Sequence, residues 1–128
     1  MPSTRIETRA GWLGERRRDL IEAVQAALID GFLIPERDRC VRLLEFEPGA
    51  FIVPPDRGTS YMVVEVTLFS GRSLDAKRRF YRSVVERTGR LGVPASDIKI
   101  ILLEVPPENW GLSGLPASEI DLGFKVDV

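Results

Sequence analysis

The sequence predicts an α+β fold in which two β-α-β units form one four-stranded mixed sheet, with both helices on one face. Three observations predict it. A short motif recurs at a constant offset of 59 residues, a strand pattern and an amphipathic helix pattern precede each copy, and an alternating segment ends the chain. At 128 residues the chain has the length of a single domain. We therefore expect one domain over 1–128, with units at about 2–48 and 60–106 and a tail at 107–128.

The repeated motif reads β-branched residue, Pro, two residues, Asp, four residues, Leu-Leu-Glu. It spans 34–45 in the first half and 93–104 in the second, so Asp97 repeats Asp38. The same offset places Pro2 on Tyr61 and Leu13 on Arg72. The two halves therefore share a framework but differ at these chemically important positions.

The first unit reads as strand, helix, strand. Residues Ser3 to Thr8 form a short polar strand pattern, and the helix pattern covers Glu15 to Ile29. Its buried face repeats at helical spacing and consists of Leu20, Ile21, Val24, Ala27 and Leu28. Gly31 is placed to end this helix. The second strand is expected near Cys40 to Glu45, with Cys40 as a small core residue.

The second unit repeats that order with a more apolar first strand. Tyr61 to Phe69 is almost continuously apolar, which is typical of a strand covered on both faces. Ser73 is a suitable N-cap for the following helix, which Gly92 is expected to close. The last strand is expected over Ile98 to Val105. Within each unit the strands should run parallel with a right-handed crossover.

Two segments lie outside the paired units. A connection rich in proline and glycine joins the halves, and a connection of this length is often functional. At the end of the chain, apolar residues from Ile120 to Val126 alternate strictly with Asp, Gly and Lys. This alternation predicts a half-buried strand that pairs with a neighbouring subunit, or alternatively packs on an edge of its own sheet.

The composition excludes several kinds of chemistry. The chain has no His and one Cys, so it has no His-based nucleophile activation, no His-built zinc site and no internal disulfide. Charged residues are spread through the first twenty positions, which excludes a signal-peptide core there, and no apolar run is long enough to span a membrane. A net charge of −1 gives no general attraction to nucleic acid or membrane surfaces, so the cytoplasm is the expected compartment.

Pro2 is the first candidate catalytic residue. Methionine is normally removed before a small second residue, which would leave Pro2 as a secondary amine at the chain terminus. A free α-amino group has a pKa of about 7.7–8.0, and a nearby guanidinium or apolar burial lowers that value. Such an amine can act as a base when neutral and as an acid when protonated.

Arg72 is the second candidate, because it lies between a strand and the Ser73 N-cap. An arginine beside a helix N-terminus is suited to binding a carboxylate, although a solvated loop charge is the simpler interpretation. Asp38 could position charge or activate water, but its repeat at Asp97 also fits a structural turn residue. Trp110, flanked by Asn109 and Gly111, could line a pocket or contact another subunit.

Together these residues resemble the tautomerase superfamily, which pairs an amino-terminal proline with duplicated β-α-β units. The similarity rests on Met1-Pro2, on the segments 93–98 and 108–111, and on the alternating tail, and it covers essentially the whole chain. The length resembles that of the fused two-unit members. Within the family, the segment 34–39 and Phe80-Tyr81 are most similar to the malonate semialdehyde decarboxylase branch.

The resemblance implies roles for these residues. Pro2 would be the catalytic amine, Asp38 an assisting carboxylate, Arg72 the binder of the substrate carboxylate, and Trp110 part of the pocket. It also implies a homotrimer that needs no cofactor and no metal. One feature departs from the decarboxylase pattern: the Arg-x-Arg pair of that branch is here Ser70-Gly71-Arg72, so Ser70 replaces the first arginine at the substrate.

This departure favours proton transfer over decarboxylation. Decarboxylation depends on precise orientation of the departing carboxylate, whereas keto-enol transfer needs one base and one carboxylate anchor. The sequence therefore predicts a tautomerase acting on a small 2-oxo carboxylic acid. Malonate semialdehyde decarboxylation or hydration at the same site is the first alternative. A ferredoxin-like module that binds a ligand without catalysis is the alternative from another class.

Overall fold

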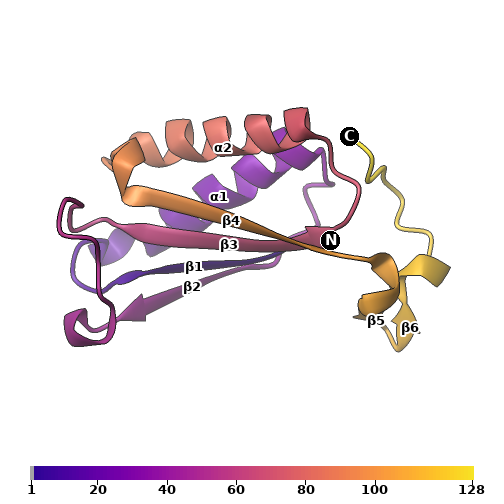
Figure 1. Ribbon diagram of the computed structural model, residues 1–128, viewed down its shortest axis with the longest axis horizontal. Coiled ribbons are helices and arrows are strands. Elements are labelled where there is room, and N and C mark those ends of the chain that lie inside the picture. Colours follow the sequence, from indigo (N-terminus) through magenta and orange to yellow (C-terminus); the bar gives the residue numbers. More distant parts are fainter. Residues whose placement is uncertain (1) are drawn as a thin grey trace.

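The computed structural model describes residues 2–128 and has two layers, a four-stranded sheet and a pair of helices that cover one of its faces (Figure 1). The strands of the main sheet are β1 (Ser3–Arg9), β2 (Val41–Phe46), β3 (Met62–Phe69) and β4 (Ile98–Val105). The helices are α1 (Arg17–Phe32) and α2 (Leu74–Gly89). The predicted fold of two β-α-β units with both helices on one face is confirmed.

The strand order is β2-β1-β3-β4, which joins the two units through their first strands. β1 runs parallel to β2 and β3 runs parallel to β4, whereas β1 and β3 are antiparallel. Thr4 pairs with Val66 across this central junction. Shifting each member of that pair by the repeat offset gives Val63 and Glu7, which also pair. The two units are therefore related by an internal pseudo-twofold axis that passes between β1 and β3.

The core lies between the helices and the sheet, and the two helices approach closely at Gly31. A Cβ at Gly31 would lie 2.6 Å from the Cβ of Phe80, so only glycine allows the helices to approach this closely. Gly31 thus lies inside α1 and does not end it, which corrects the sequence-based expectation. The helix ends at Phe32 and is capped by Leu33, whose φ of 54° is left-handed and whose N–H donates to the carbonyl of Ile29.

The second helix begins as predicted and ends earlier. The hydroxyl of Ser73 accepts a hydrogen bond from the N–H of Ala76 at 3.0 Å, which confirms Ser73 as the N-cap. The helix stops at Gly89, before the expected Gly92. Gly92 instead takes a φ of +89° in the turn that leads to Val93.

Cys40 is exposed, so its prediction as a core residue was wrong. It precedes Val41, the first residue of the edge strand β2, and shares with Arg42 the side of the strand that points away from the helices. The guanidinium of Arg42 approaches the Cys40 sulfur to 3.3 Å. A β-strand alternates its two faces, and the repeat pattern alone did not indicate on which face Cys40 would lie.

The tail does not form the predicted strand within this chain. After a small hairpin of β5 (Gly111–Leu112) and β6 (Leu115–Pro116), residues 120–128 contain no strand. A positive φ of 74° at Gly123 interrupts the extended backbone, and the tail bends back toward the start of α2 (Figure 1). The burial still alternates, since Ile120, Leu122, Phe124 and Val126 are half-buried and the residues between them are exposed. Pairing with a neighbouring subunit stays a prediction.

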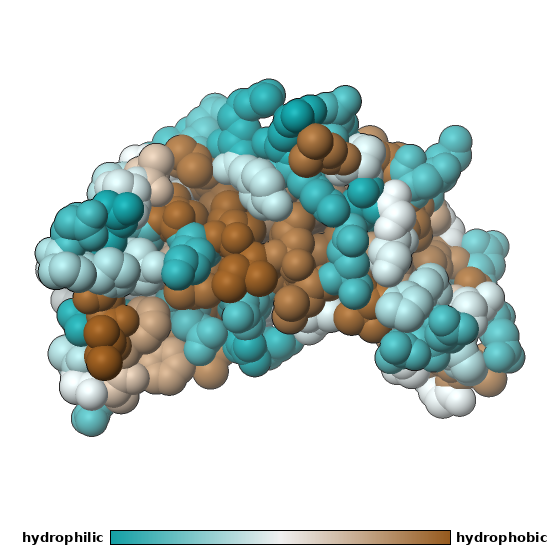
Figure 2. Space-filling view, viewed as in Figure 1, coloured by the Kyte–Doolittle hydropathy of each residue, from teal (hydrophilic) through white to brown (hydrophobic). Residues whose placement is uncertain are grey.

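The sheet face without helices carries apolar side chains at the surface. Figure 2 shows a brown apolar area across the middle of the molecule, where the strands lie in Figure 1. On β4, Ile101 and Leu103 are 38% and 46% exposed. Within the described residues, neither helix is both long and apolar enough to cross a membrane.

Candidate functional site

The residues singled out by the sequence come from four segments that meet at one end of the sheet. Pro2 precedes β1 and Asp38 precedes β2, and these two strands start at the same end because they are parallel. Arg72 follows β3 and Trp110 follows β4, which finish at that end because β3 is antiparallel to β1. Figure 1 shows the start of β1 beside the point where β3 leads into α2.

Pro2 is buried at the start of β1. The N–H of Thr4 donates to the carbonyl of Cys40 at 2.9 Å, which fixes the first residues of β1 against the segment entering β2. Continuing the observed pairing backward sets Pro2 beside Arg39 on one side and Leu68 on the other. Met1 lies outside the described residues, so its expected removal stays a prediction.

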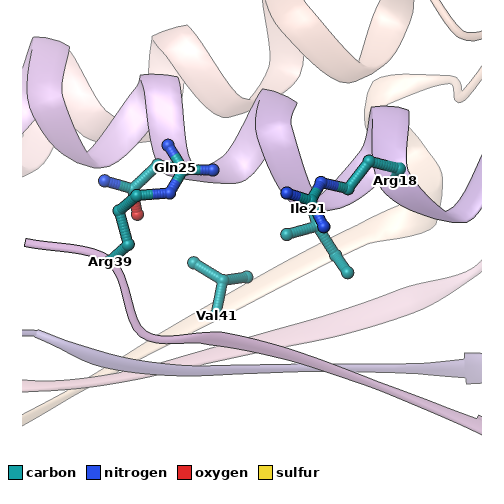
Figure 3. Close-up of a pocket in the computed structure, with 5 residues that line it drawn as sticks. All are labelled: Arg18, Ile21, Gln25, Arg39 and Val41. Atoms are coloured by element: carbon teal, nitrogen blue, oxygen red, sulfur yellow. The ribbon is translucent and has the colours of Figure 1, made fainter. Parts of the chain in front are cut away.

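Asp38 is 8% exposed and its backbone is held on both sides. Its N–H donates to the carbonyl of Pro35 at 3.0 Å, and its own carbonyl accepts a hydrogen bond from Nε2 of Gln25 at 3.0 Å. Figure 3 shows Gln25 extending from α1 toward the segment that carries Arg39 and Val41. Gln25, which is 2% exposed, therefore positions the loop that presents Asp38.

The sequence interpretation missed Gln25, although a signal was present. Gln25 lies four residues after Ile21 and three before Leu28, on the buried face of α1. A long polar side chain on such a face needs a hydrogen-bond partner, because burying an unpaired amide is costly. That requirement indicates a backbone group nearby that Gln25 holds in place.

Arg72 is a buried cation, with an exposed fraction of 5%. Its Nη1 donates to the carbonyl of Phe32 at 2.7 Å and lies 3.4 Å from that of Lys125. Its guanidinium carbon lies 5.3 Å from the ring centroid of Phe32 and 5.9 Å from that of Phe124. Its Nε and Nη2 are buried and have no hydrogen-bond partner among residues 2–128.

This environment explains the electrostatics of Arg72. Burial lowers the pKa of the Arg72 guanidinium from its usual value, and the negative charge of Asp38 opposes that shift. An arginine remains protonated in proteins, so the two unpaired N–H groups are donors held in a site of low polarity. Burying such donors is costly, and an anion that accepts from them would recover that cost.

Trp110 and Ser70 lie at the same end of the sheet in different environments. The indole N–H of Trp110 donates to the carbonyl of Val105 at 3.2 Å, and its ring lies 4.8 Å from that of Phe69. Trp110 is half-buried, so its ring contributes to the surface there. Ser70 is exposed and its N–H also donates to Val105. Arg72, two residues later, is buried, so the two side chains differ in exposure.

The tail covers this group of residues. Leu122 and Phe124, together with Pro35, Arg37 and Asp38, line a cavity of about 280 Å³. Phe124 also packs on the hydrophobic core, and the carbonyl of Val128 accepts hydrogen bonds from the N–H and the hydroxyl of Ser73. In the single chain, the tail therefore closes over Arg72 and the cavity beside Asp38.

The arrangement suits binding a small anion at the unpaired N–H groups of Arg72. Within the described residues there is no cluster of three or more His, Cys, Asp or Glu side chains that could hold a metal ion. The site contains the guanidinium of Arg72, the buried carboxylate of Asp38 and the start of β1.

Comparisons with known proteins agree on the family. A family model described as tautomerase enzyme matches residues 38–113. A probable tautomerase of Ralstonia nicotianae is 35% identical over 57 residues, which make up 44% of this chain and 81% of that protein. The match therefore covers most of that protein but less than half of this chain.

Solved structures match nearly the whole chain. The structure of FG41 malonate semialdehyde decarboxylase inhibited by 3-bromopropiolate is 28% identical, with a TM-score of 0.79 covering 87% of this chain and 88% of that chain. A fused 4-OT solved as an asymmetric trimer is 19% identical, with a TM-score of 0.80 covering 91% and 96%. The second likeness concerns the fold alone.

Proposed function

Because the chain belongs to the tautomerase family and carries its β-α-β unit twice, we propose that Pro2 catalyses keto-enol proton transfer on a small 2-oxo carboxylic acid. In this proposal, removal of Met1 frees the Pro2 amine. One observation carries the choice of substrate class: Arg72 holds two buried N–H donors without a partner, close to Asp38 and at the same end of the sheet as Pro2.

Arg72 supplies the anchor for the substrate. Its Nε and Nη2 lie on one edge of the guanidinium plane, and such an edge donates two parallel hydrogen bonds to the two oxygens of a carboxylate. Nη1 is engaged with the carbonyl of Phe32, so the side chain is fixed before the substrate arrives. A pre-oriented donor loses little conformational freedom on binding, which favours both affinity and alignment.

Pro2 then moves the proton. The neutral amine takes the proton from the enol oxygen as the carbonyl forms, and the resulting prolinium gives a proton to carbon 3, which regenerates the amine. The cation of Arg72 and apolar burial favour the neutral amine, whereas the carboxylate of Asp38 favours the prolinium. Asp38 is therefore assigned the role of stabilising the charged intermediate state of Pro2.

Access to Arg72 requires the tail to move, which links the proposal to oligomerisation. Phe124 and the carbonyl of Lys125 lie against the guanidinium in the single chain. We propose that the protein forms a homotrimer in which the tail pairs with a neighbouring subunit and uncovers the site. The trimeric state of a fused 4-OT and the apolar sheet face support this proposal. Sedimentation of the wild type and of Phe124→Asp tests it, and a trimer unaffected by the substitution counts against the role of the tail.

The catalytic test combines an intact mass with a substitution. The mature protein should begin at Pro2, and Pro2→Ala should lower turnover of a phenylpyruvate-like enol by about 10²–10⁴-fold, the contribution of a positioned acid-base group. Pro94→Ala, in the turn before β4, is the matched control and should leave turnover nearly unchanged. Active protein that fully retains Met1 would rule out the proposal, because its Pro2 nitrogen would be an amide.

Decarboxylation is the second candidate reaction at this site. The 28% identity to FG41 malonate semialdehyde decarboxylase favours it. Exposed Ser70 in place of an arginine argues against it, since a single guanidinium then orients the substrate. Comparing malonate semialdehyde with a 2-oxo acid enol on the same preparation decides between the two, and Ser70→Arg should shift the ratio toward decarboxylation. A non-catalytic binding module would convert neither substrate. We propose the cytoplasm as the compartment in which the enzyme acts.

A further inference from the structure

A second cavity lies at the end of the sheet opposite the N-terminus. It has a volume of about 300 Å³ and is lined by residues from the end of β1 and from the long connection between the units: Arg9, Ala10, Gly11, Trp12, Pro48 and Thr59. This volume is at the lower end of the range found for small-molecule sites. The internal pseudo-twofold axis exchanges this end of the sheet with the end that carries Pro2.

Trp12 forms a fixed aromatic wall of this cavity. Its indole N–H donates to the hydroxyl of Thr8 at 3.0 Å, and that hydroxyl donates to the carbonyl of Tyr61 at 2.7 Å. The guanidinium carbon of Arg16 lies 5.9 Å from the centroid of the Trp12 ring. The indole is therefore held in one orientation, and a rigid aromatic surface binds a flat apolar ligand at low entropic cost.

Arg9 supplies a charge at the edge of the same cavity. Its Nε donates to the carbonyl of Phe51 at 2.7 Å, which ties the side chain to the connection between the units. Within residues 2–128, its two Nη groups make no hydrogen bond or ion pair. Arg9 and Thr59 also border a neighbouring cavity that reaches Arg57.

We propose that this cavity binds a small aromatic carboxylate. The ring of the ligand packs against Trp12 and Pro48, and its carboxylate accepts hydrogen bonds from the Nη groups of Arg9 and the hydroxyl of Thr59. The volume is sufficient, because an apolar cavity of about 150 Å³ accommodates benzene. The repeat offset puts Tyr61 at the position equivalent to Pro2, so no terminal amine can act here. This independent observation fits a site that binds a ligand without catalysis.

The two tryptophans allow the site to be tested directly, because each lies at a different end of the sheet. Trp110→Phe leaves Trp12 as the only indole, and Trp12→Phe leaves Trp110. In the full chain carrying Trp110→Phe, phenylacetate should change the fluorescence saturably. The uncharged analogue phenylacetamide should bind at least about tenfold more weakly, because it loses the charge-assisted contact with Arg9. This comparison needs no change in the cavity itself.

A pair of arginine variants completes the test. In the Trp110→Phe background, Arg9→Met should weaken phenylacetate binding by about tenfold or more, whereas Arg57→Met, whose guanidinium pairs with Asp56, should not. Three results would overturn the proposal: no saturable change at Trp12, equal binding of phenylacetamide, or equal effects of the two arginine variants. A response seen only in Trp12→Phe would place phenylacetate at the Pro2 end and would also overturn it. The test does not depend on catalysis by Pro2.

Discussion

The two ends of the sheet use the same repeat position for different purposes. At one end, the carboxylate of Asp97 accepts hydrogen bonds from the N–H of Gly58 at 2.8 Å and from the hydroxyl of Ser60 at 2.7 Å. At the other end, Gln25 holds the backbone of Asp38, and the carboxylate acts on the buried charge of Arg72. Asp97 fixes a loop, whereas the Asp38 carboxylate interacts electrostatically with a cation that has unused donors.

A second pair of repeat positions shows the same contrast between a structural end and a charged end. Leu13 and Arg72 are related by the repeat offset, and their exposed fractions are 2% and 5%. Leu13 joins the hydrophobic core, while Arg72 places a charge and two unpaired N–H groups in an equally buried position. A buried charge without full compensation is destabilising, so its presence at one end of a duplicated fold supports the proposed role of Arg72 as the substrate anchor.

The largest expected effect on stability comes from introducing a buried charge at the end of the sheet that carries Leu13 and Asp97. Leu13→Arg should lower the free energy of unfolding by about 3–5 kcal/mol, because Leu13 is 2% exposed and lies in the hydrophobic core, where the charge of an arginine would be uncompensated. Urea denaturation measures the change. Leu115→Arg is the control, since Leu115 is 50% exposed and its replacement should cost less than about 0.5 kcal/mol. A loss below about 1 kcal/mol for Leu13→Arg would mean that the two ends tolerate charge equally.

The reverse substitution should separate activity from stability. Arg72→Leu should lower kcat/KM for a 2-oxo acid by about ten- to 150-fold, the value of a charge-assisted contact of about 1.5–3 kcal/mol. The free energy of unfolding should change by less than about 1 kcal/mol, because losing the bond to Phe32 is offset by removing a buried charge. Parallel kinetics and urea denaturation test this, and a stability loss with unchanged kcat/KM would show that Arg72 is structural.

Much of this comparison could be predicted from the sequence, because the repeat is local and regular. The motif around Asp38 and Asp97 identified both units, and the strand Ile98–Val105 was placed with its observed bounds. Ser73 was identified as an N-cap because serine chemistry and helix starts are coupled at short range. The sequence also showed that the repeat offset relates Leu13 to Arg72, but it did not show that both side chains are buried.

What the sequence could not provide depends on contacts between distant segments. Gly31 looks like a helix terminus until the approach of Phe80 explains why it lies inside α1. Cys40 could not be assigned to a face, because the side on which an edge strand is covered depends on the whole sheet. The alternation after Ile120 correctly indicated which residues face inward. It could not show that Gly123 bends the tail over Arg72, because strand formation needs a partner that a single chain does not specify.

A smaller effect is expected from the structural aspartate itself. Asp97→Asn should lower the free energy of unfolding by about 1–2 kcal/mol, because an amide cannot accept as strongly from both Gly58 and Ser60. Asp38→Asn is the paired variant, and its main effect should fall on kcat. Thermal denaturation together with kinetics checks both. If instead Asp97→Asn were inactive but stable, and Asp38→Asn active but destabilised, the assignment of the structural and the catalytic end would be reversed.

The smallest effect concerns a contact between the helices that exists in only one copy. Asp30 of α1 accepts hydrogen bonds from Ser83 at 2.6 Å and Arg87 at 2.9 Å on α2, whereas its repeat counterpart is Gly89. These contacts lower the pKa of Asp30, the bond from Ser83 most strongly. The carboxylate is 42% exposed, so solvent screening limits the contribution to less than about 1 kcal/mol.

The pH dependence follows from the direction of that shift. A carboxyl group with a lowered folded-state pKa contributes its full stability above its unfolded value of about 3.9, and that stability is lost as the pH falls through the folded value. Asp30→Asn should therefore be less stable than the wild type at pH 7, and the difference should shrink as the pH falls below about 4. Urea denaturation over this range measures it, with the exposed loop variant Asp56→Asn as the control. A difference that persists at the lowest pH at which both proteins fold would assign the effect to packing, and the asymmetry between the units would then not be electrostatic at this contact.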